Sequence, residues 1–482
     1  MSTAAEADTP IVSIVDAFTD DNLLGGSFGS DTREAWRAIL SGAFALPMNN
    51  ERYNLFKQLA GRREPPSQRV RELWTIAGRR SDKSHTAAGI AVYLATIGAE
   101  QEGILSKLAA GERGVILCLA CDRAQAKVAL AYVKGLIADS PVLSSMLDRD
   151  DKDGVTLSNG ISIEVATNSY RAVRGRTLLA AILDEVAFFR SDESASPDTE
   201  VYRALVPSLA TTAGMLIGIS SPYARRGLLY DKWRRHYGRD GDVLVTQAGT
   251  REMNPTVPAA IVKEAYADDP EAARAEWGGQ FRSDVASFLS REAVERCVRS
   301  APLEIPHQPN QTYFAFTDPA GGGNDEFAIC IGHREGDRLN GYTIVVDCLR
   351  AQRGTPADIV LEYAALLKQY GVRKVSGDRF GGDWPSDEFE RHGINYIMAE
   401  KPKSGLYLDL LPAMNSERIE LPPDAKLTTQ LAMLERRTSR AGRDSIDHPP
   451  NGSDDRANVI AGLFATGRIT STTLELWAKL AG

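Results

Sequence analysis

Short apolar runs alternate with amphipathic stretches from about Leu73 onward. Five runs predict strands that are apolar throughout, at residues 72–78, 114–120, 161–167, 178–185 and 214–221. Between them, residues 84–98 and 123–137 have the spacing of helices. Uniformly apolar strands separated by helices are typical of a parallel sheet that helices cover on both faces. We therefore expect an α/β domain with a mainly parallel sheet in this part of the chain.

A second alternating block begins with a predicted strand at residues 312–318. Residues 327–349 contain two apolar runs joined through the turn-rich sequence REGDRLNG, which predicts an antiparallel hairpin. A helix at 356–371, a strand at 374–378 and a terminal helix at 454–465 follow. This order predicts a mixed sheet with flanking helices, so the second domain differs from the first.

The predicted elements divide the 482 residues into four parts. Residues 1–60 form a helical lead-in, residues 61–250 the first α/β domain, residues 251–305 a connector without a strand run, and residues 306–482 the second domain. Length supports the division, because single hydrophobic cores stop growing near about 250–300 residues.

Composition and charge narrow the class of protein. With 43% hydrophobic and 25% charged residues, the chain has the profile of a soluble globular protein. No apolar run reaches the roughly 18 residues that span a bilayer, and the N-terminus lacks a signal-peptide pattern, so we expect a cytoplasmic protein. The net charge of −8 argues against a passive nucleic-acid coat, although an enzyme could still hold DNA through local basic patches.

Three groups of basic residues are candidates for such patches. One group follows the predicted strand at 214–221 and consists of Arg225, Arg226, Lys232, Arg234, Arg235 and Arg239. The second precedes Asp454 and consists of Arg436, Arg437, Arg440 and Arg443, and the third is Lys401 with Lys403 in a predicted hairpin. A solvated basic face is the default explanation for each group. Cys118 and Cys121 form a CxxC pair without a second pair, which favours core packing over a zinc site.

A strand, a loop and a helix at residues 72–98 follow the order of a phosphate-binding loop. The sequence Ala77-x4-Asp82-Lys83-Ser84 has the spacing of that motif, with both glycine positions replaced. Phosphates bind the backbone N–H groups at a helix N-terminus, where Lys83 would reach the β and γ phosphates and Ser84 would ligate Mg²⁺. Helices also begin with charged residues for other reasons, so this motif is weak by itself.

A second motif about a hundred residues later strengthens this interpretation. The apolar strand LLAAIL ends in Asp184 and Glu185, the form of a Walker B element. Asp184 would hold Mg²⁺, and Glu185 would polarise the attacking water. A further strand ends in Ser220, Ser221 and Pro222. Small hydroxyl residues beside the phosphates suit the coupling of γ-phosphate loss to movement, although this triplet alone is also an ordinary turn.

Carboxylates in the second domain stand at the ends of its predicted elements. Asp318 ends one strand, Asp378 ends another, and Asp454 and Asp455 open the last helix. Carboxylates that converge from separate segments fit two-metal phosphodiester hydrolysis with Mg²⁺ or Mn²⁺. Each of them alone fits a turn or a helix cap. Asp325 either assists this metal site or caps the next strand.

In their order and spacing, these motifs resemble the large terminase subunit of tailed bacteriophages. The residues that carry the resemblance are the DKS of the loop, ILDE, SSP, a strand-end aspartate, SGD and a helix-opening DD. The resemblance covers nearly the whole chain, including the lead-in around Trp36 and Arg37.

The resemblance implies an N-terminal additional-strand P-loop ATPase that drives viral double-stranded DNA into a procapsid. It also implies a C-terminal RNase H-like endonuclease that cuts concatemeric DNA. The implied cofactors are ATP with Mg²⁺ in the first site and two Mg²⁺ or Mn²⁺ in the second. The implied partners are the portal protein of the procapsid, the small terminase subunit and further copies of the chain in a homo-oligomeric ring. The isolated chain would be a monomer, and its location the host cytoplasm.

The resemblance also assigns roles to single residues. The nucleotide-binding positions are Arg79, which would contact the γ-phosphate, with Arg80, Ser81, Lys83, Ser84 and Asp184. Glu185 matches the catalytic glutamate, and residues 220–222 match the coupling motif. The nuclease positions are Asp318, Asp378 and one or both of Asp454 and Asp455. Arg174 or Arg176 would be a trans-acting arginine finger, and ordinary loop arginines fit those two positions as well.

Asp82 departs from the family, in which glycine precedes the lysine. Its carboxylate would repel the phosphates, and we expect a weakened affinity for nucleotide that Arg79, Arg80 and Lys83 partly offset. Two other functions remain open at this point. A repair-type helicase-nuclease would need a second motor lobe, and a DNA-binding scaffold with a degenerate ATP site would cleave or bind DNA without ATP hydrolysis.

Overall fold

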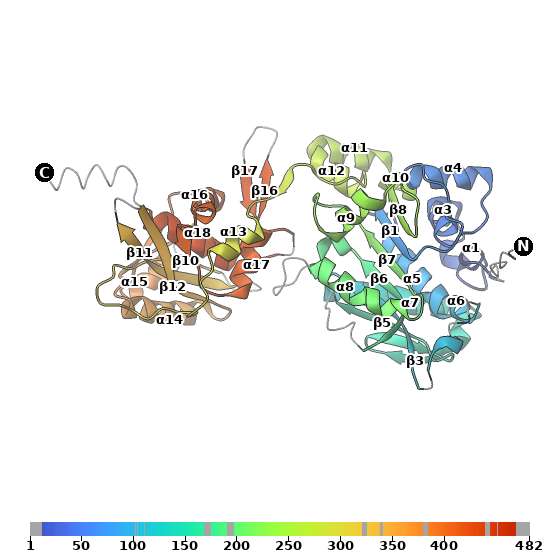
Figure 1. Cartoon of the computed structure of the whole chain (residues 1–482), viewed down its shortest axis with the longest axis horizontal. Coiled ribbons are helices and arrows are strands. Elements are labelled where there is room, and N and C mark those ends of the chain that lie inside the picture. The colour runs from blue at the N-terminus through green and yellow to red at the C-terminus, as the bar shows by residue number, and fades with distance from the viewer. Residues whose placement is uncertain are drawn as a thin grey trace, which may run out of the picture. The chain divides into compact units, whose positions relative to one another are not determined.

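A computed structural model describes residues 12–101, 103, 105–109, 111–167, 175–189, 197–320, 325–337, 341–378, 384–438, 444–450 and 452–468 (Figure 1). Its contacts divide the chain into two compact units, and the division in the described chain falls between Ser283 and Asp284.

The first unit is built on an eight-stranded sheet in the order β3-β4-β5-β2-β6-β7-β1-β8. The strands from β5 to β8 in this order run parallel, and β3 and β4 extend the edge antiparallel. The bounds are β1 (Glu72–Ala77), β2 (Gly114–Ala120), β3 (Leu147–Asp151), β4 (Gly154–Leu157), β5 (Ser162–Thr167), β6 (Thr177–Asp184), β7 (Met215–Ser220) and β8 (Val243–Ala248). The predicted mainly parallel α/β fold is confirmed, and all five predicted strands are present. Sequence reasoning missed β3, β4 and β8.

The position of β7 defines the class of this sheet. It lies between β1, which leads into the candidate phosphate loop, and β6, which ends in Asp184. One additional strand between these two is the arrangement that the sequence resemblance implied. Parallel strands present their carboxyl ends at one edge, so the segments that follow β1, β6 and β7 meet there.

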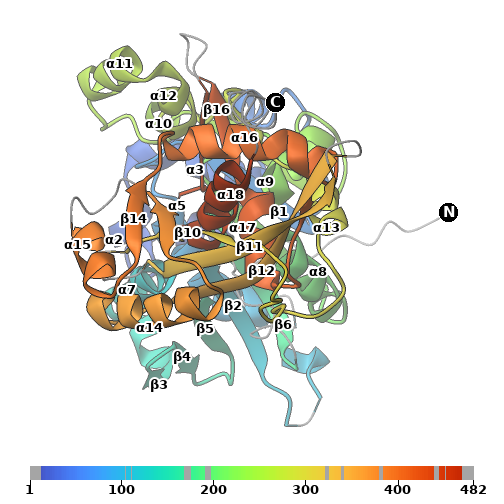
Figure 2. The ribbon, with the colours of Figure 1, turned by 90° about the vertical axis from the view of Figure 1, so that its left-hand side faces the viewer.

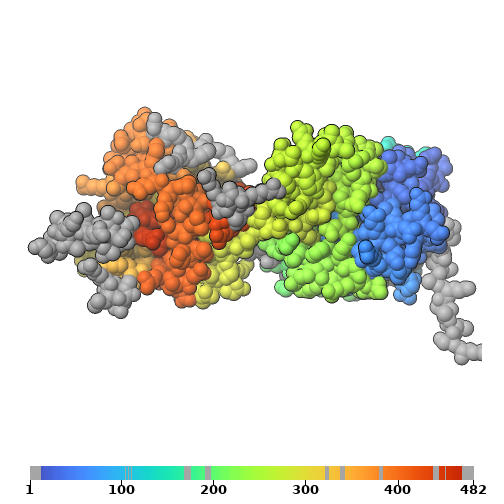
Figure 3. All heavy atoms as spheres, turned by 90° about the horizontal axis from the view of Figure 1, so that it is seen from above, coloured from blue at the N-terminus to red at the C-terminus, as the bar shows by residue number. Residues whose placement is uncertain are grey.

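Helices cover both faces of this sheet because alternate strand residues belong to two different cores. Leu73 packs in one core with α3 (Glu34–Ala43), α5 (Lys83–Ala95) and α7 (Arg123–Asp139). Trp74 packs in the other with α8 (Pro197–Ala210) and α9 (Gly227–His236). The lead-in is thus part of the first core, and in Figure 3 its blue spheres lie directly against the rest of the unit.

The second unit contains a mixed six-stranded sheet in the order β14-β13-β10-β11-β12-β15. β10, β11 and β12 pair antiparallel, whereas β13 and β14 continue parallel to β10, and β15 pairs parallel with β12. The bounds are β10 (Phe314–Asp318), β11 (Phe327–Asp337), β12 (Gly341–Gln352), β13 (Lys374–Gly377), β14 (Asn395–Met398) and β15 (Ile419–Glu420). The predicted mixed sheet and its hairpin are confirmed.

Helices also cover both faces of the mixed sheet, with α14 (Pro356–Gln369) on one face and α16 (Lys403–Asn415) and α18 (Asp455–Gly467) on the other (Figure 2). α18 approaches β10 closely because it has Gly462 at the contact. A Cβ added there would meet the Phe316 ring at 2.3 Å. The close approach fixes the first turn of α18 beside the carboxyl end of β10.

A smaller sheet, β17-β16-β9, completes the second unit. It consists of β9 (Val285–Ser287), β16 (Glu435–Thr438) and β17 (Asp444–Asp447). The expectation that residues 251–305 contain no strand is therefore wrong. These residues also contribute to both units, because the division at 283/284 falls inside them. Lys403 begins α16, so the predicted hairpin around Lys401 and Lys403 is wrong too. No helix in the described parts of the chain is long and apolar enough to cross a membrane.

Two candidate catalytic sites

The loop between β1 and α5 is fixed by side chains from distant parts of the sequence. The Trp36 indole donates to the Ser81 carbonyl at 2.8 Å, Thr250 Oγ1 donates to the Arg79 carbonyl at 2.7 Å, and Asn254 Nδ2 donates to the Arg80 carbonyl at 2.9 Å. Thr250 and Asn254 belong to no motif, and sequence reasoning missed them. Donors on α3 and at α10 (Thr250–Met253) thus bind three carbonyl groups of the loop and fix its position.

Lys83 connects the loop with the ends of the two neighbouring strands. Its Nζ donates to the carbonyls of Ala77 at 3.2 Å and Gly78 at 3.0 Å, and to Ser221 Oγ at 3.0 Å. It also lies 3.5 Å from a carboxylate oxygen of Glu185. The structure therefore brings together the predicted residues of all three motifs.

Asp184 has the features of a buried cation ligand. It is 5% exposed, and among the described residues its Oδ1 has no hydrogen-bond partner. Burial, followed by repulsion from Glu185, raises the pKa of Asp184 to about 6, although a hydrogen bond with Ser84 and the charge of Lys83 lower it. Oxygen ligands from Ser84 and Asp184 suit Mg²⁺, so the residues present fit that ion.

Glu185 contacts the segment predicted to couple hydrolysis to movement. It has a left-handed backbone, with φ of 53°, and one carboxylate oxygen accepts from Ser220 Oγ at 3.1 Å and from the Ser221 backbone N–H at 3.0 Å. Pro222 follows directly and is buried. A change at Glu185 would thus act on β7 through two hydrogen bonds.

Asp82 occupies the glycine position with a left-handed backbone, φ of 62°, and its carboxylate forms an ion pair with Arg33. His85 Nδ1 lies 3.3 Å from the same carboxylate. Arg79 instead pairs with Glu276 at 3.1 Å. In the described chain, the cation that pairs with Asp82 therefore comes from the lead-in, and the prediction that Arg79, Arg80 and Lys83 partly offset a weakened nucleotide affinity stays a prediction.

Of the two candidate arginine fingers, Arg176 lies away from this chain's own nucleotide site. Arg176 precedes β6, so it stands at the opposite end of that strand from Asp184. It forms an ion pair with Glu164 at 2.5 Å. Arg174 lies outside the described residues. A role for either residue in a neighbouring copy stays a prediction.

In the second unit, Asp318 and Asp378 come together at the carboxyl ends of the parallel strands β10 and β13. The Asn458 amide nitrogen lies 2.8 Å from an oxygen of Asp318 and 3.2 Å from an oxygen of Asp378. The amide oxygen of Asn458 is buried and has no partner among the described residues. Sequence reasoning missed Asn458, although its position four residues after Asp454 puts both on one helix face.

Asp318 lies in a concentration of negative charge. Burial raises the pKa of Asp318 to about 7, the hydrogen bond from Asn458 opposes this shift, and the carboxylates of Asp378, Asp455 and Asp454 add to it. A cluster of buried and half-buried carboxylates with a hydrogen-bonding amide is a suitable oxygen ligand set for Mg²⁺ or Mn²⁺.

Asp454 and Asp455 point to different partners. Asp454 accepts from Lys403 Nζ at 2.8 Å and from the Tyr407 hydroxyl at 2.7 Å. An oxygen of Asp455 accepts from the Glu326 backbone N–H at 3.2 Å, and burial raises the pKa of Asp455, as do Asp454 and Asp325. Asp325 itself is exposed. The two aspartates that open α18 therefore have separate surroundings within one site.

Two further residues that the sequence did not single out join Asp454. Ligand atoms of Asp447, His448 and Asp454 all lie within 4.8 Å of one another. The Lys403 ammonium contacts two of these residues, lying 3.0 Å from Asp447 and 2.8 Å from Asp454. Burial alone would lower the pKa of Lys403, but Asp454 and Asp447 hold it above its ordinary value, so this group stays charged.

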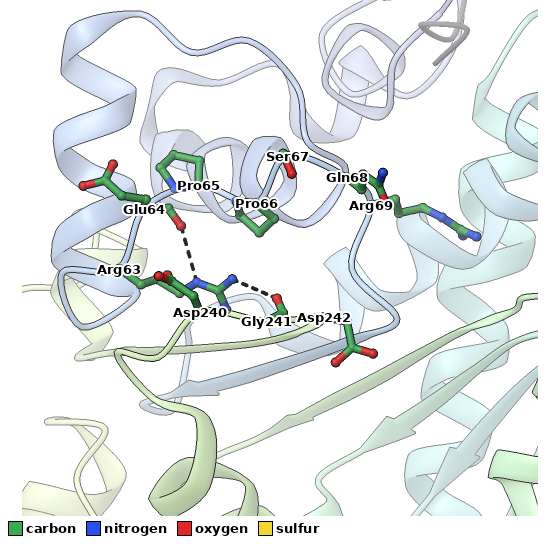
Figure 4. A pocket seen from close by; sticks show the side chains of 10 residues that line it. All are labelled: Arg63, Glu64, Pro65, Pro66, Ser67, Gln68, Arg69, Asp240, Gly241 and Asp242. Atoms are coloured by element: carbon green, nitrogen blue, oxygen red, sulfur yellow. Dashed lines mark hydrogen bonds between the residues drawn. The ribbon is translucent and has the colours of Figure 1, made fainter. Parts of the chain in front are cut away.

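A separate pocket of about 420 Å³ opens in the first unit at the end of the sheet where β1 and β8 begin (Figure 4). It is lined by residues around the starts of β1 and β8: Arg63, Glu64, Pro65, Pro66, Ser67, Gln68, Arg69, Asp240, Gly241 and Asp242. The Arg63 guanidinium donates to the Gly241 carbonyl at 3.0 Å. The phosphate loop follows the end of β1, so this pocket and the nucleotide site lie at opposite ends of that strand.

One predicted basic patch is partly internal. Lys232 is buried, and its Nζ lies 2.5 Å from Glu72 and 2.8 Å from the Tyr202 hydroxyl. Lys232 therefore belongs to a buried ion pair, and the candidate DNA-binding group after β7 loses this member. Cys118 is buried within β2, as the core-packing interpretation predicts.

Comparison with known structures finds bacteriophage large terminases. The chain is similar to the HK97 bacteriophage large terminase at 15% identity and a TM-score of 0.38, over 90% of this chain and 100% of that one. It is similar to the large terminase of the thermophilic bacteriophage D6E at 10% identity and a TM-score of 0.38, over 90% and 98% of the two chains. The magnesium-bound large terminase nuclease from thermophilic phage G20c matches at 21% identity and a TM-score of 0.31, over 36% and 96%.

No family model matches the chain, and no curated protein matches it. Similarities with TM-scores below 0.5 do not assign a function to this chain. The functional assignment therefore depends on the contacts within the two sites.

Proposed function

We propose that this protein is the motor subunit of a viral DNA-packaging machine, with an ATPase in the first unit and a metal-dependent endonuclease in the second. The observation that carries the proposal is the presence of both sites in one chain, each at the carboxyl edge of its sheet. ATP hydrolysis would drive double-stranded DNA into a procapsid, and the endonuclease would cut concatemeric DNA.

In the first unit, the proposed roles follow the contacts. Lys83 moves its ammonium from the loop carbonyls to the β and γ phosphates. Ser84 and Asp184 would hold Mg²⁺, which neutralises charge on the phosphates. Glu185 orients and polarises the attacking water. Its hydrogen bonds to Ser220 and Ser221 give loss of the γ-phosphate a direct route to β7.

In the second unit, Asp318 and Asp378, with Asp455 or Asp454, would hold Mg²⁺ or Mn²⁺. The bound ion would activate water and stabilise the charge on the phosphate during phosphodiester hydrolysis. Asn458 orients the first two carboxylates through its amide nitrogen. The resemblance to large terminases implies two divalent ions at this centre.

The proposed partners are double-stranded viral DNA, the portal protein and the small terminase subunit. Several copies of the chain would form a ring on the portal in the host cytoplasm, and the isolated chain would be a monomer. A ring is favoured by the position of Arg176, which stands far from the nucleotide site of its own chain.

Two variants test the proposal. Glu185→Ala should abolish DNA-stimulated phosphate release, and Asp378→Ala should abolish Mg²⁺- or Mn²⁺-dependent plasmid cleavage. Glu264→Ala on α11 (Ala259–Asp268) and Asp387→Ala on α15 (Trp384–Arg391) are matched controls, because both replace exposed acids outside the sites. Absence of both activities from the unaltered protein would refute the proposal.

The same assays separate the alternatives. Cleavage without any ATPase activity would favour a DNA-binding scaffold with a degenerate nucleotide site. A repair-type helicase-nuclease would unwind DNA, and it would need a second motor lobe; the described chain contains a single sheet with a phosphate loop. Strand separation by the purified protein would favour that function.

A further inference from the structure

Lys403 places a positive charge between two acidic side chains of the nuclease site. The three groups come from separate elements: Lys403 begins α16, Asp447 ends β17, and Asp454 precedes α18. The ammonium lies 3.0 Å from Asp447 and 2.8 Å from Asp454. This geometry depends on how α16 packs against α18 and β17.

Each carboxylate oxygen of Asp454 already accepts a hydrogen bond from a protein donor. One carboxylate oxygen accepts from Lys403, and the other accepts from the hydroxyl of Tyr407, which is fully buried. The contacting oxygen of Asp447 also accepts from the His448 backbone N–H at 2.9 Å. A divalent ion between Asp447 and Asp454 would therefore have to displace an ammonium that both carboxylates bind.

The surroundings of Asp318 differ from those of Asp454. Its carboxylate accepts from a neutral amide, that of Asn458, and none of the described lysines or arginines forms an ion pair with it. Asp378 shares the same amide nitrogen. The half of the acidic site around Asp454 thus contains its own cation. The half around Asp318 presents two carboxylates on one neutral amide, which is where a divalent ion would bind.

We propose that the Lys403 ammonium is the second cation of the nuclease centre, so that the centre takes one divalent ion, at Asp318 and Asp378. This inference rests on the proposed endonuclease function. It revises the two-ion expectation, because the position between Asp447 and Asp454 is held by a side chain.

Lys403 can also reach a substrate. An ammonium group has three N–H donors, and two of them are directed at Asp447 and Asp454. The side chain is 30% exposed, so the third donor can meet a phosphate oxygen that enters from solvent. In the reaction, the water oxygen loses a proton to solvent and forms a bond to phosphorus while the bond to the leaving 3′ oxygen breaks. Lys403 would stabilise the negative charge by hydrogen bonding and keep its own protons, and solvent would protonate the leaving oxygen.

Counting bound Mn²⁺ on the full chain without nucleotide tests this inference apart from activity. The ions that are lost in the double variant Asp318→Asn with Asp454→Asn are those of the nuclease centre. We expect one such ion in the unaltered protein and two in Lys403→Met, which keeps the length of the side chain and removes its charge. Lys401→Met is the matched control, since Lys401 pairs with Asp409 at 2.6 Å and should leave the count at one. Two ions in the unaltered protein would overturn the proposal.

The metal dependence of plasmid cleavage gives a second measurement. Lys403→Met should cleave at least about tenfold more slowly at limiting Mn²⁺, in line with the loss of a group that supports a metal centre. Its activity should rise more steeply with Mn²⁺ concentration than that of the unaltered protein, and Lys403→Arg should keep the original dependence. Circular dichroism would show whether Lys403→Met still folds. If it folds and its cleavage depends on Mn²⁺ concentration as in the unaltered protein, Lys403 is not the second cation. If no variant cleaves DNA, the endonuclease function fails, and the ion count still decides the position of Lys403.

Discussion

The two sites solve one physical problem in different ways. Each collects carboxylates at the carboxyl edge of parallel strands, where buried negative charge needs a cation. In the first unit, Asp184 and Glu185 are adjacent in sequence, and Lys83 lies in a contiguous motif with Ser84. In the second unit, the carboxylates and Lys403 come from separate strands, loops and helices. The first site is encoded locally, and the second exists only after the unit has folded.

The difference extends to the supporting residues. The loop of the first site has a recognisable sequence, but Trp36, Thr250 and Asn254 hold it from a distance. In the second site even the central amide, Asn458, comes from outside the predicted motifs. Distant support is thus common to both sites, and only the first has a local core of residues that a sequence pattern can find.

The largest expected effect tests whether the two sites work independently. Glu185→Gln removes the carboxylate that polarises water and should lower ATP hydrolysis by about 10²–10⁴-fold. Plasmid cleavage at saturating Mn²⁺ should stay within about twofold of the unaltered protein, because Asp318, Asp378 and the Asn458 amide that binds them belong to the other unit. Phosphate release and nicking assays on the same preparation measure both. Parallel loss of cleavage would show that the sites are coupled.

The next effect concerns the residue that joins the two nuclease carboxylates. Asn458→Ala removes the amide between Asp318 and Asp378 and should reduce metal affinity or cleavage by about 10–100-fold. ATP hydrolysis should not change. Asn415→Ala, at an exposed position at the end of α16, is the matched control. Full cleavage by Asn458→Ala at limiting Mn²⁺ would contradict this role.

A smaller effect tests the ion pair between the lead-in and the phosphate loop. Arg33→Ala leaves the Asp82 carboxylate without its cation and should weaken binding of ATP by about 3- to 10-fold, since the pair is partly exposed. In a protein that carries Asp82→Gly, the same change should have little effect. Binding of a nucleotide analogue by all four proteins gives the coupling between the two residues. Equal losses in both backgrounds would rule out the pairing as the cause.

Asp82→Gly by itself completes that cycle. Removal of the carboxylate should strengthen nucleotide binding only slightly. The Arg33 guanidinium already neutralises the charge of Asp82, which would repel the phosphates if it were unpaired. Titration with ATP and measurement of turnover give both quantities. Equal affinity and rate in the two proteins would show that Asp82 does not weaken nucleotide use.

The smallest effect concerns the distant support of the loop. Thr250→Val keeps the shape of the side chain and removes its hydrogen bond to the Arg79 carbonyl, which should destabilise the first unit by about 1 kcal/mol. Thermal unfolding followed by circular dichroism measures the change. A melting temperature that does not fall would indicate that Trp36 and Asn254 hold the loop without Thr250.

The fold was largely readable from the sequence because apolar periodicity is local. All five predicted strands of the first unit and the hairpin of the second are present. β8 was missed although VLVTQA is an apolar run, and β9 was missed because three residues carry too little pattern. The predicted hairpin around Lys401 and Lys403 is wrong because Lys403 begins the helix α16.

The sequence by itself determined which residues end the apolar strands, and therefore both the position of the nucleotide motifs and the presence of carboxylates at the ends of nuclease elements. Only the tertiary structure decided the partners of these carboxylates: Asp82 pairs with Arg33, Asp454 binds Lys403 and Tyr407, and Asp318 and Asp378 share the amide of Asn458. The physical reason is that burial and hydrogen-bond geometry depend on how distant elements pack, whereas strand and helix patterns depend on neighbours along the chain.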